Sequence, residues 1–68
     1  MTLGEKLRKL RLSAQLSTRS IEDVLKMGYG NLSRYERDLV QPTFKSVVKI
    51  SRFYNIDIRD LAKCTLGE

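Results

Sequence analysis

The side chains best suited to chemistry in this sequence are polar and basic ones between residues 16 and 42. The guanidinium group of Arg34 can donate two parallel hydrogen bonds to O6 and N7 of a guanine, and the amide of Asn31 can pair with the edge of an adenine. Tyr29 can contact a phosphate or pack against a thymine methyl group. These residue types indicate contact with nucleic acid, although Tyr29 and Asn31 also suit an ordinary solvated helix face.

Catalysis and metal binding have little support in the sequence. There is no histidine, and the single cysteine, Cys64, has neither a base to activate its thiol nor a second cysteine for an intrachain disulfide. The sequence also lacks a glycine-rich phosphate loop and a group of carboxylates at metal-ligand spacing. We therefore expect no enzyme activity, no cofactor and no metal site.

Size and charge narrow the choice of partner. The 68 residues suffice for one small domain, expected over residues 1–68. The net charge of +5 favours a polyanion such as nucleic acid, the alternative being a basic face that contacts only water. No apolar stretch approaches the roughly 18 residues of a membrane span, and the N-terminus lacks an export signal. We expect a cytoplasmic protein without membrane contact.

Apolar residues at helical spacing predict an all-α chain with five helices and no strand. The first helix has an inward stripe of residues three or four positions apart: Leu3, Leu7, Leu10 and Ala14. Leu12 points nearly opposite this stripe and is expected to be exposed. Arg11 lies at the edge of the stripe and is expected to be partly covered.

The next two predicted helices are short and are joined by a tight corner, Lys26-Met27-Gly28. Ser17 is a suitable N-cap for the second helix, and Glu22 is expected to face outward or to lie at its edge. Gly30 falls inside the predicted third helix. The inward residues of the two helices are Ile21, Val24, Leu25, Leu32 and Tyr35. Two such helices, with polar and basic residues on the outer face of the second, are typical of a helix-turn-helix that places its second helix in the DNA major groove.

Two further helices complete the expected fold. Pro42 and Thr43 open the fourth helix, with Thr43 as its cap. Its inward stripe contains Phe44, Val47, Val48, Ser51 and Tyr54, widened by Ile50 and Phe53. Phe44 and Tyr54 are expected in the core. Asn55 ends this helix, and Asp57 caps a short fifth helix that contains Leu61.

Four segments follow one another in an order and spacing that resemble the Cro/phage-repressor helix-turn-helix family, also called the Xre family: GEKLRKLR, LS, LSRYER and QPTFKSVVKISRFYNIDIRDL. The resemblance covers about residues 3–62 without gaps. It implies a five-helix, lambda-repressor-like DNA-binding domain.

The sequence departs from the family pattern around the corner. Thr18 stands where glutamine is usual, and Glu22 stands where the family has alanine packed against the recognition helix. Lys26 stands where the family has glycine. Either Lys26 adopts a left-handed conformation, at a cost of about 1 kcal/mol, or the corner is reshaped around Gly28. These departures affect where the recognition helix begins.

Carried over by position, the resemblance implies which residues contact DNA. Base contacts come from the start of the third helix and one turn later, at Tyr29, Gly30, Ser33 and Arg34, with Asn31 nearby. Phosphate contacts flank them, at Thr18, Arg19, Arg37, Gln41 and Lys45. Thr18 and Arg19 lie at the start of the second helix, where free amides and the helix dipole attract an anion. Arg19 also suits an ordinary surface charge.

The resemblance further implies an ion pair and a dimer contact. Glu36 pairs with Arg11, which ties the first helix to the third and keeps the carboxylate away from phosphate; an exposed charge is the alternative. Family members bind as dimers through the fourth and fifth helices. This region offers Phe53, Ile56 and Ile58 for a dimer contact, and Phe53 also suits a gap in the core.

Two functions remain open at this point. The first is a sequence-specific DNA-binding transcription regulator, a repressor that binds a two-fold operator in double-stranded DNA as a homodimer and is controlled by its concentration or by a protein partner. The second is a protein-interaction module of helix-turn-helix fold that binds another regulator or a toxin. The departures at Glu22, Lys26 and Gly30 keep the second function open.

Overall fold

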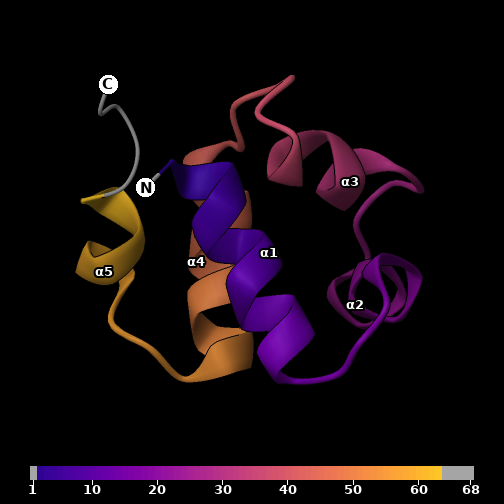
Figure 1. Ribbon diagram of the computed structural model, residues 1–68, viewed down its shortest axis with the longest axis horizontal. Coiled ribbons are helices and arrows are strands. Elements are labelled where there is room, and N and C mark those ends of the chain that lie inside the picture. The colour runs from indigo at the N-terminus through magenta and orange to yellow at the C-terminus, as the bar shows by residue number, and fades with distance from the viewer. Residues whose placement is uncertain (1, 64–68) are drawn as a thin grey trace.

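The structure, a computed structural model, describes residues 2–63 and contains five α-helices and no strand within that range. The helices are α1 (Leu3–Ser13), α2 (Thr18–Leu25), α3 (Asn31–Glu36), α4 (Phe44–Tyr54) and α5 (Ile58–Ala62). Their principal contacts close a ring in the order α1, α3, α2, α4, α5 and back to α1. In Figure 1, α2 and α3 lie to one side of α1 and α4, and α5 lies to the other. The predicted all-α, five-helix fold is confirmed.

Side-chain caps fix where four of the helices begin. Ser17 accepts a hydrogen bond from the amide of Ser20, Thr43 from that of Ser46, and Asp57 from that of Arg59, so the three predicted caps are confirmed. Thr2 caps α1 in a reciprocal capping box with Glu5. The exception is α3, whose N-cap residue is Gly30 and has no side chain to offer.

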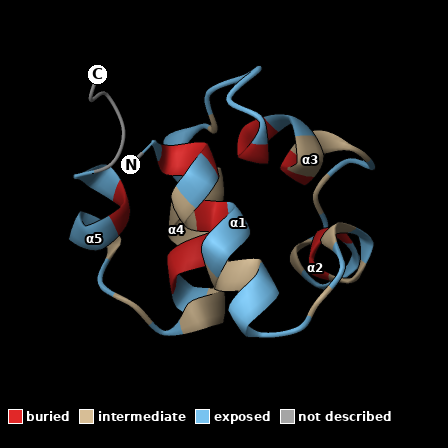
Figure 2. Cartoon of the chain, viewed as in Figure 1, coloured by how far each residue is buried: buried red, intermediate tan, exposed pale blue. Residues whose placement is uncertain are grey.

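The core lies inside the ring of helices, and Figure 2 shows buried residues on the inward side of each helix. Every helix contributes at least one buried apolar side chain, and together they are Leu3, Leu7, Ile21, Leu32, Tyr35, Ile50 and Leu61. A domain of this size has room for only a limited apolar core, and partly buried apolar residues pack around this cluster. The buried core residues that hold α2 and α3 are Ile21 on α2 and Leu32 and Tyr35 on α3.

Two left-handed residues end helices as the sequence indicates. Lys26 is the C-cap of α2 with φ 55° and ψ 41°, which decides between the two alternatives for the corner. Asn55 ends α4 with φ 56° and ψ 46°. Lys49 of α4 supports the corner, because its Nζ donates to the carbonyl of Leu25 at 3.2 Å. Lys49 therefore supplies a hydrogen-bond donor to the last carbonyl of α2, next to the position where Lys26 adopts the costly left-handed conformation.

The predicted inward face of α2 is wrong in two places. Val24 is 63% exposed, and Glu22, expected outside, is only 3% exposed. The buried arc of α2 runs through Ile21, Leu25 and Glu22, so it is turned away from Val24. The reason is a buried partner for the carboxylate: Glu22 Oε2 accepts a hydrogen bond from the amide of Leu32 at 2.9 Å.

The predictions that Phe44 lies in the core and that Ala14 belongs to the inward stripe of α1 are also wrong. Phe44 is 77% exposed, because it is the first residue of α4 and precedes the part of that helix centred on Ile50 and Ser51 that faces the core. It lines a surface hollow of about 230 Å³ between the start of α4 and α5. Ala14 is exposed because α1 ends at Ser13. Leu12 is exposed as predicted.

The start of α1 packs directly on the end of α3. A Cβ atom added at Gly4 would lie 2.6 Å from the carbonyl oxygens of both Tyr35 and Glu36. The backbone amide of Gly4 donates to Asp38 Oδ1 at 3.0 Å, and the hydroxyl of Thr2 donates to Asp38 Oδ2 at 2.7 Å. This close approach fixes one end of α3 relative to α1.

Candidate nucleic-acid interface

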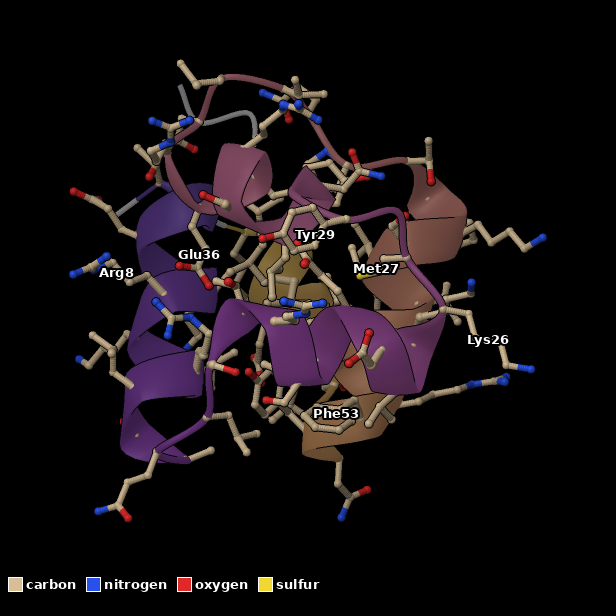
Figure 3. The ribbon with its side chains drawn as sticks, turned by 90° about the vertical axis from the view of Figure 1, so that its right-hand side faces the viewer. Arg8, Lys26, Met27, Tyr29, Glu36 and Phe53 are labelled. Atoms are coloured by element: carbon tan, nitrogen blue, oxygen red, sulfur yellow. The ribbon has the colours of Figure 1, made fainter. Side chains whose placement is uncertain are left out.

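The residues expected to contact bases surround the start of α3, and Figure 3 shows Tyr29 on the face turned toward the viewer. The structure begins α3 at Asn31, so Tyr29 and Gly30 belong to the turn that precedes it. The prediction that Gly30 lies inside the helix is wrong. With φ 87° it occupies a conformation that glycine adopts at little cost and other residues adopt rarely. The recognition helix is therefore short, and Tyr29 reaches outward from the turn.

Arg34 is exposed on the outer face of α3, and Ser33 is half-buried beside it. Arg34 Nη1 donates a hydrogen bond to Asn31 Oδ1 at 3.2 Å, one turn earlier. The contact occupies one donor of the guanidinium and leaves the others for a ligand. Asn31 thus lies where it supports Arg34, in addition to any contact of its own.

Tyr29 and Arg19 lie against each other on the same face. Tyr29 is 77% exposed, and the guanidinium carbon of Arg19 is 5.2 Å from the centre of its ring. A cation above an aromatic face at this distance is attracted by the ring. The turn before α3 and the first turn of α2 are thereby brought together, which the sequence did not indicate.

The residues expected to contact phosphate lie at the ends of helices and in the loop between α3 and α4. Thr18 begins α2 and is half-buried, whereas Arg19 next to it is exposed. Arg37 is the C-cap of α3, Gln41 lies in the following loop, and Lys45 is in the first turn of α4. All three are exposed, as a phosphate contact requires.

The pair of Arg11 and Glu36 is present and bidentate. Arg11 Nε donates to Glu36 Oε2 at 2.7 Å, and Arg11 Nη2 donates to Oε1 at 3.0 Å. Only 13% of the arginine side chain and 4% of the glutamate side chain are exposed. Arg11 Nη1 also donates to the carbonyl of Leu16 at 2.9 Å. The hydrogen bond to Glu36 raises the pKa of Arg11, and burial together with the nearby Glu36 charge raises the pKa of Tyr54. The pair locks α1, α3 and the loop before α2 together.

Three acidic residues around α3 have carboxylates that are hydrogen-bonded within the protein: Glu22 and Glu36 are buried, and Asp38 is exposed. Glu36 binds Arg11, Glu22 binds the amide of Leu32, and both oxygens of Asp38 accept hydrogen bonds from the start of α1. Sequence reasoning missed the roles of Glu22 and Asp38. For Glu22 the signals were present in the sequence: it is an acid where the resemblance implies alanine, and Gly30 stands where a capping side chain is usual.

The three residues expected at a dimer contact have different environments. Phe53 and Ile56 are half-buried and pack against the core, and the ring of Phe53 meets that of Tyr54 edge-on with centroids 5.0 Å apart. Ile58 lines the hollow next to Phe44. Each keeps part of its surface exposed, so a dimer contact in this region stays a prediction.

Residues 2–63 hold no cluster of three or more residues suited to a metal ion. None of the helices in this range is long and apolar enough to cross a membrane. Cys64 lies outside the described residues.

Comparison with known proteins agrees with this architecture. A family model described as "Helix-turn-helix" matches residues 7–61. The HTH-type transcriptional regulator ImmR of Bacillus subtilis (strain 168) is 36% identical over 56 residues, which are 82% of this chain and 44% of that protein. The chain thus spans less than half the length of this relative. The match over residues 7–61 confirms the resemblance drawn from the sequence, and the chain belongs to the Xre-type helix-turn-helix family.

Proposed function

We propose that the protein is a sequence-specific DNA-binding regulator of transcription that inserts α3 into the major groove. Arg34, supported by Asn31, reads a guanine, and Tyr29 contacts the neighbouring thymine or phosphate. Arg19, Arg37 and the residues Thr18, Gln41 and Lys45 hold the phosphates on either side and set the register of α3 in the groove.

The observation that supports this proposal is the arrangement of charged side chains around α3, where arginines are exposed and most acids are hydrogen-bonded within the protein. Glu22, Glu36 and Asp38 all have their carboxylates bonded to the protein itself, while Arg19, Arg34 and Arg37 are exposed. Glu22 and Glu36 are buried, whereas Asp23 and Asp38 are exposed, and Asp38 has both carboxylate oxygens hydrogen-bonded to the start of α1. A face with its acids withdrawn and its arginines presented attracts a polyanion. The printed name of the B. subtilis relative, a transcriptional regulator, supports the same function.

Repression through a two-fold operator is the form of regulation that we propose. One short recognition helix reads only a few base pairs, which is too few to select a site in a genome. Two copies on a palindromic site double the sequence that is read, and bound protein excludes other proteins from the same DNA. The contact between copies would use the exposed surface of Phe53, Ile56 and Ile58.

Selection from a pool of random DNA duplexes tests the function. We expect enrichment of one sequence, with a footprint centred on it and affinity that falls steeply as salt rises. Fluorescence anisotropy against the enriched and a scrambled duplex then gives the preference. A pool with no enriched sequence would contradict the proposal and would favour the alternative of a protein-interaction module.

A further inference from the structure

Glu22 is the most deeply buried charged residue of the described chain, at 3% exposure, and the DNA contacts proposed above do not use it. It lies in the middle of α2, next to the core residue Ile21, and its carboxylate points to α3. Burying a carboxylate is costly unless it is hydrogen-bonded. Its presence here, where the resemblance implies alanine, therefore requires a specific use.

The partner of Glu22 is the amide that helix capping normally satisfies. Leu32 is the second residue of α3, and its amide donates to Glu22 Oε2 at 2.9 Å. In an ordinary helix an N-cap side chain accepts from this position. Gly30, with φ 87° and no side chain, makes no such bond. Glu22 thus supplies from a neighbouring helix the cap that α3 lacks, and its negative charge lies at the positive end of the α3 dipole.

Glu22 also holds the other end of the corner. Its backbone carbonyl accepts the amide of Met27 at 2.9 Å, just after α2 ends. One residue therefore binds the exit of α2 through its backbone and the entry of α3 through its side chain. Since α3 has only six residues, its own hydrogen bonds cannot set its direction, and contacts to its neighbours must do so.

We propose that Glu22 is a positioning residue for DNA recognition, in which its carboxylate caps α3 and fixes the angle at which Arg34 and Ser33 meet the base pairs. The inference rests on the proposed function.

Two variants of similar size separate the hydrogen bond from the packing. Glu22→Gln keeps an acceptor oxygen for the Leu32 amide, whereas Glu22→Met fills similar space without a strong acceptor. Asp23→Asn is the matched control, because it removes the same charge from an exposed position on the same helix. The equal change in net charge means that long-range attraction to DNA rises equally in all three variants.

The readout is the ratio of affinities for the selected duplex and for scrambled DNA, measured where circular dichroism shows each variant to be fully folded. We expect Glu22→Met to lower this ratio by about tenfold, the loss that follows when a bidentate base contact is misaligned. Glu22→Gln and Asp23→Asn should keep it within about threefold of wild type by the same measure. Hydrogen exchange of the Leu32 amide should accelerate in Glu22→Met and not in Glu22→Gln.

A role confined to stability predicts a different result. Glu22→Met would then melt at a lower temperature, while its affinities for the two duplexes would change together and leave the ratio unchanged. That outcome, or equal ratios in the Met and Gln variants, overturns the inference. If Glu22→Met does not fold, loss of preference in Glu22→Gln overturns it. If the wild-type protein has no preferred duplex, the proposed function is overturned. In that case, faster hydrogen exchange of the Leu32 amide in Glu22→Met, with slow exchange kept in Glu22→Gln, would show that Glu22 caps α3 for another purpose.

Discussion

Arg11 and Arg34 are chemically identical side chains that the fold uses differently. Arg11 is nearly buried and directs three nitrogens to Glu36 and to the carbonyl of Leu16. Arg34 is exposed and has one hydrogen bond, to the exposed end of Asn31. A guanidinium with all three nitrogens hydrogen-bonded inside the protein holds structure together, and an exposed one with most of its donors free can bind a ligand.

At this scale we expect Arg34→Ala to weaken binding to the selected duplex by about 1–3 kcal/mol, because a base-edge donor fork is lost. Anisotropy titration measures the change. Arg8→Ala, which removes an equal charge from an exposed position on α1, should weaken binding to the selected and scrambled duplexes by similar amounts. If both variants keep the wild-type preference, the recognition face has been assigned wrongly.

A second expectation concerns stability. Arg11→Ala should lower the free energy of unfolding by about 3 kcal/mol, because Glu36 stays buried without its partner. The exposed Arg8→Ala should change it by no more than about 0.5 kcal/mol. Urea denaturation of both variants gives the comparison. Equal stability of the two variants would show that the Arg11–Glu36 pair contributes no net stability.

At the scale of elements, the short helix α3 depends on its neighbours at both ends. Its entry is bound by Glu22 of α2, and its exit lies against Gly4 of α1 and is followed by Asp38, which binds the same turn of α1. The helix is held in place from outside, in agreement with the low stability of an isolated helix of this length.

Gly4→Ala tests the junction between α1 and α3. In a helix interior this substitution normally stabilises by about 1 kcal/mol. Here the added methyl group would meet two backbone carbonyl oxygens at 2.6 Å, and backbone cannot move aside cheaply. We expect a loss of about 1–3 kcal/mol instead. A rise in melting temperature would show that α1 and α3 are not packed this closely.

Asp57 gives a pH dependence to the start of α5. Its pKa is lowered from 3.8 to about 2, first by the side-chain hydrogen bond from Arg59 and then by the backbone amide of the same residue. A lowered pKa in the folded state means that the charge stabilises the protein above the ordinary pKa and ceases to do so as pH falls from 3.8 to about 2. Asp57→Asn keeps an acceptor for the cap and loses the charge.

We therefore expect Asp57→Asn to melt slightly below wild type at neutral pH, with the difference disappearing on acidification through that range. The difference should be small, because both side chains are exposed to solvent. Thermal melts at several pH values measure it. A difference in melting temperature that grows as the pH falls would mean that the charge of Asp57 destabilises the folded state.

For the molecule as a whole, the closed ring of five helices places α2 and α3 on one side and α5 on the other (Figure 1). The prediction of a single domain over residues 1–68 stays a prediction, since the structure describes residues 2–63.

Assembly on DNA is the prediction at this scale. We expect selected duplexes to contain two half-sites related by two-fold symmetry, with centres about one helical turn, roughly 34 Å, apart. Two protein chains should bind each duplex, while the free protein stays largely monomeric because the available apolar surface is small. Sedimentation of protein alone and with duplex measures both. One chain bound to an asymmetric site, without gain from a second half-site, would refute the dimer.

The order of the helices, most of their caps and the family could be predicted from the sequence alone. Caps depend on local chemistry: Ser17, Thr43 and Asp57 each bond an amide two or three residues away, so the sequence contains all that is needed. Asn55 was predicted to end the fourth helix, and the structure shows that it does so in a left-handed conformation. The family followed from residues whose order and spacing the sequence displays directly.

Which side of α2 is buried and where α3 begins depend on tertiary contacts, and they could not be predicted from the sequence. Burial of Glu22 depends on an amide ten residues away that its carboxylate reaches only after the corner has folded, and this contact turns Val24 outward. Exposure of Phe44 likewise depends on which helices pack around the first turn of α4. Periodicity reveals which residues share a helix face, but the partner that covers a face, or a carboxylate on it, comes from distant parts of the chain.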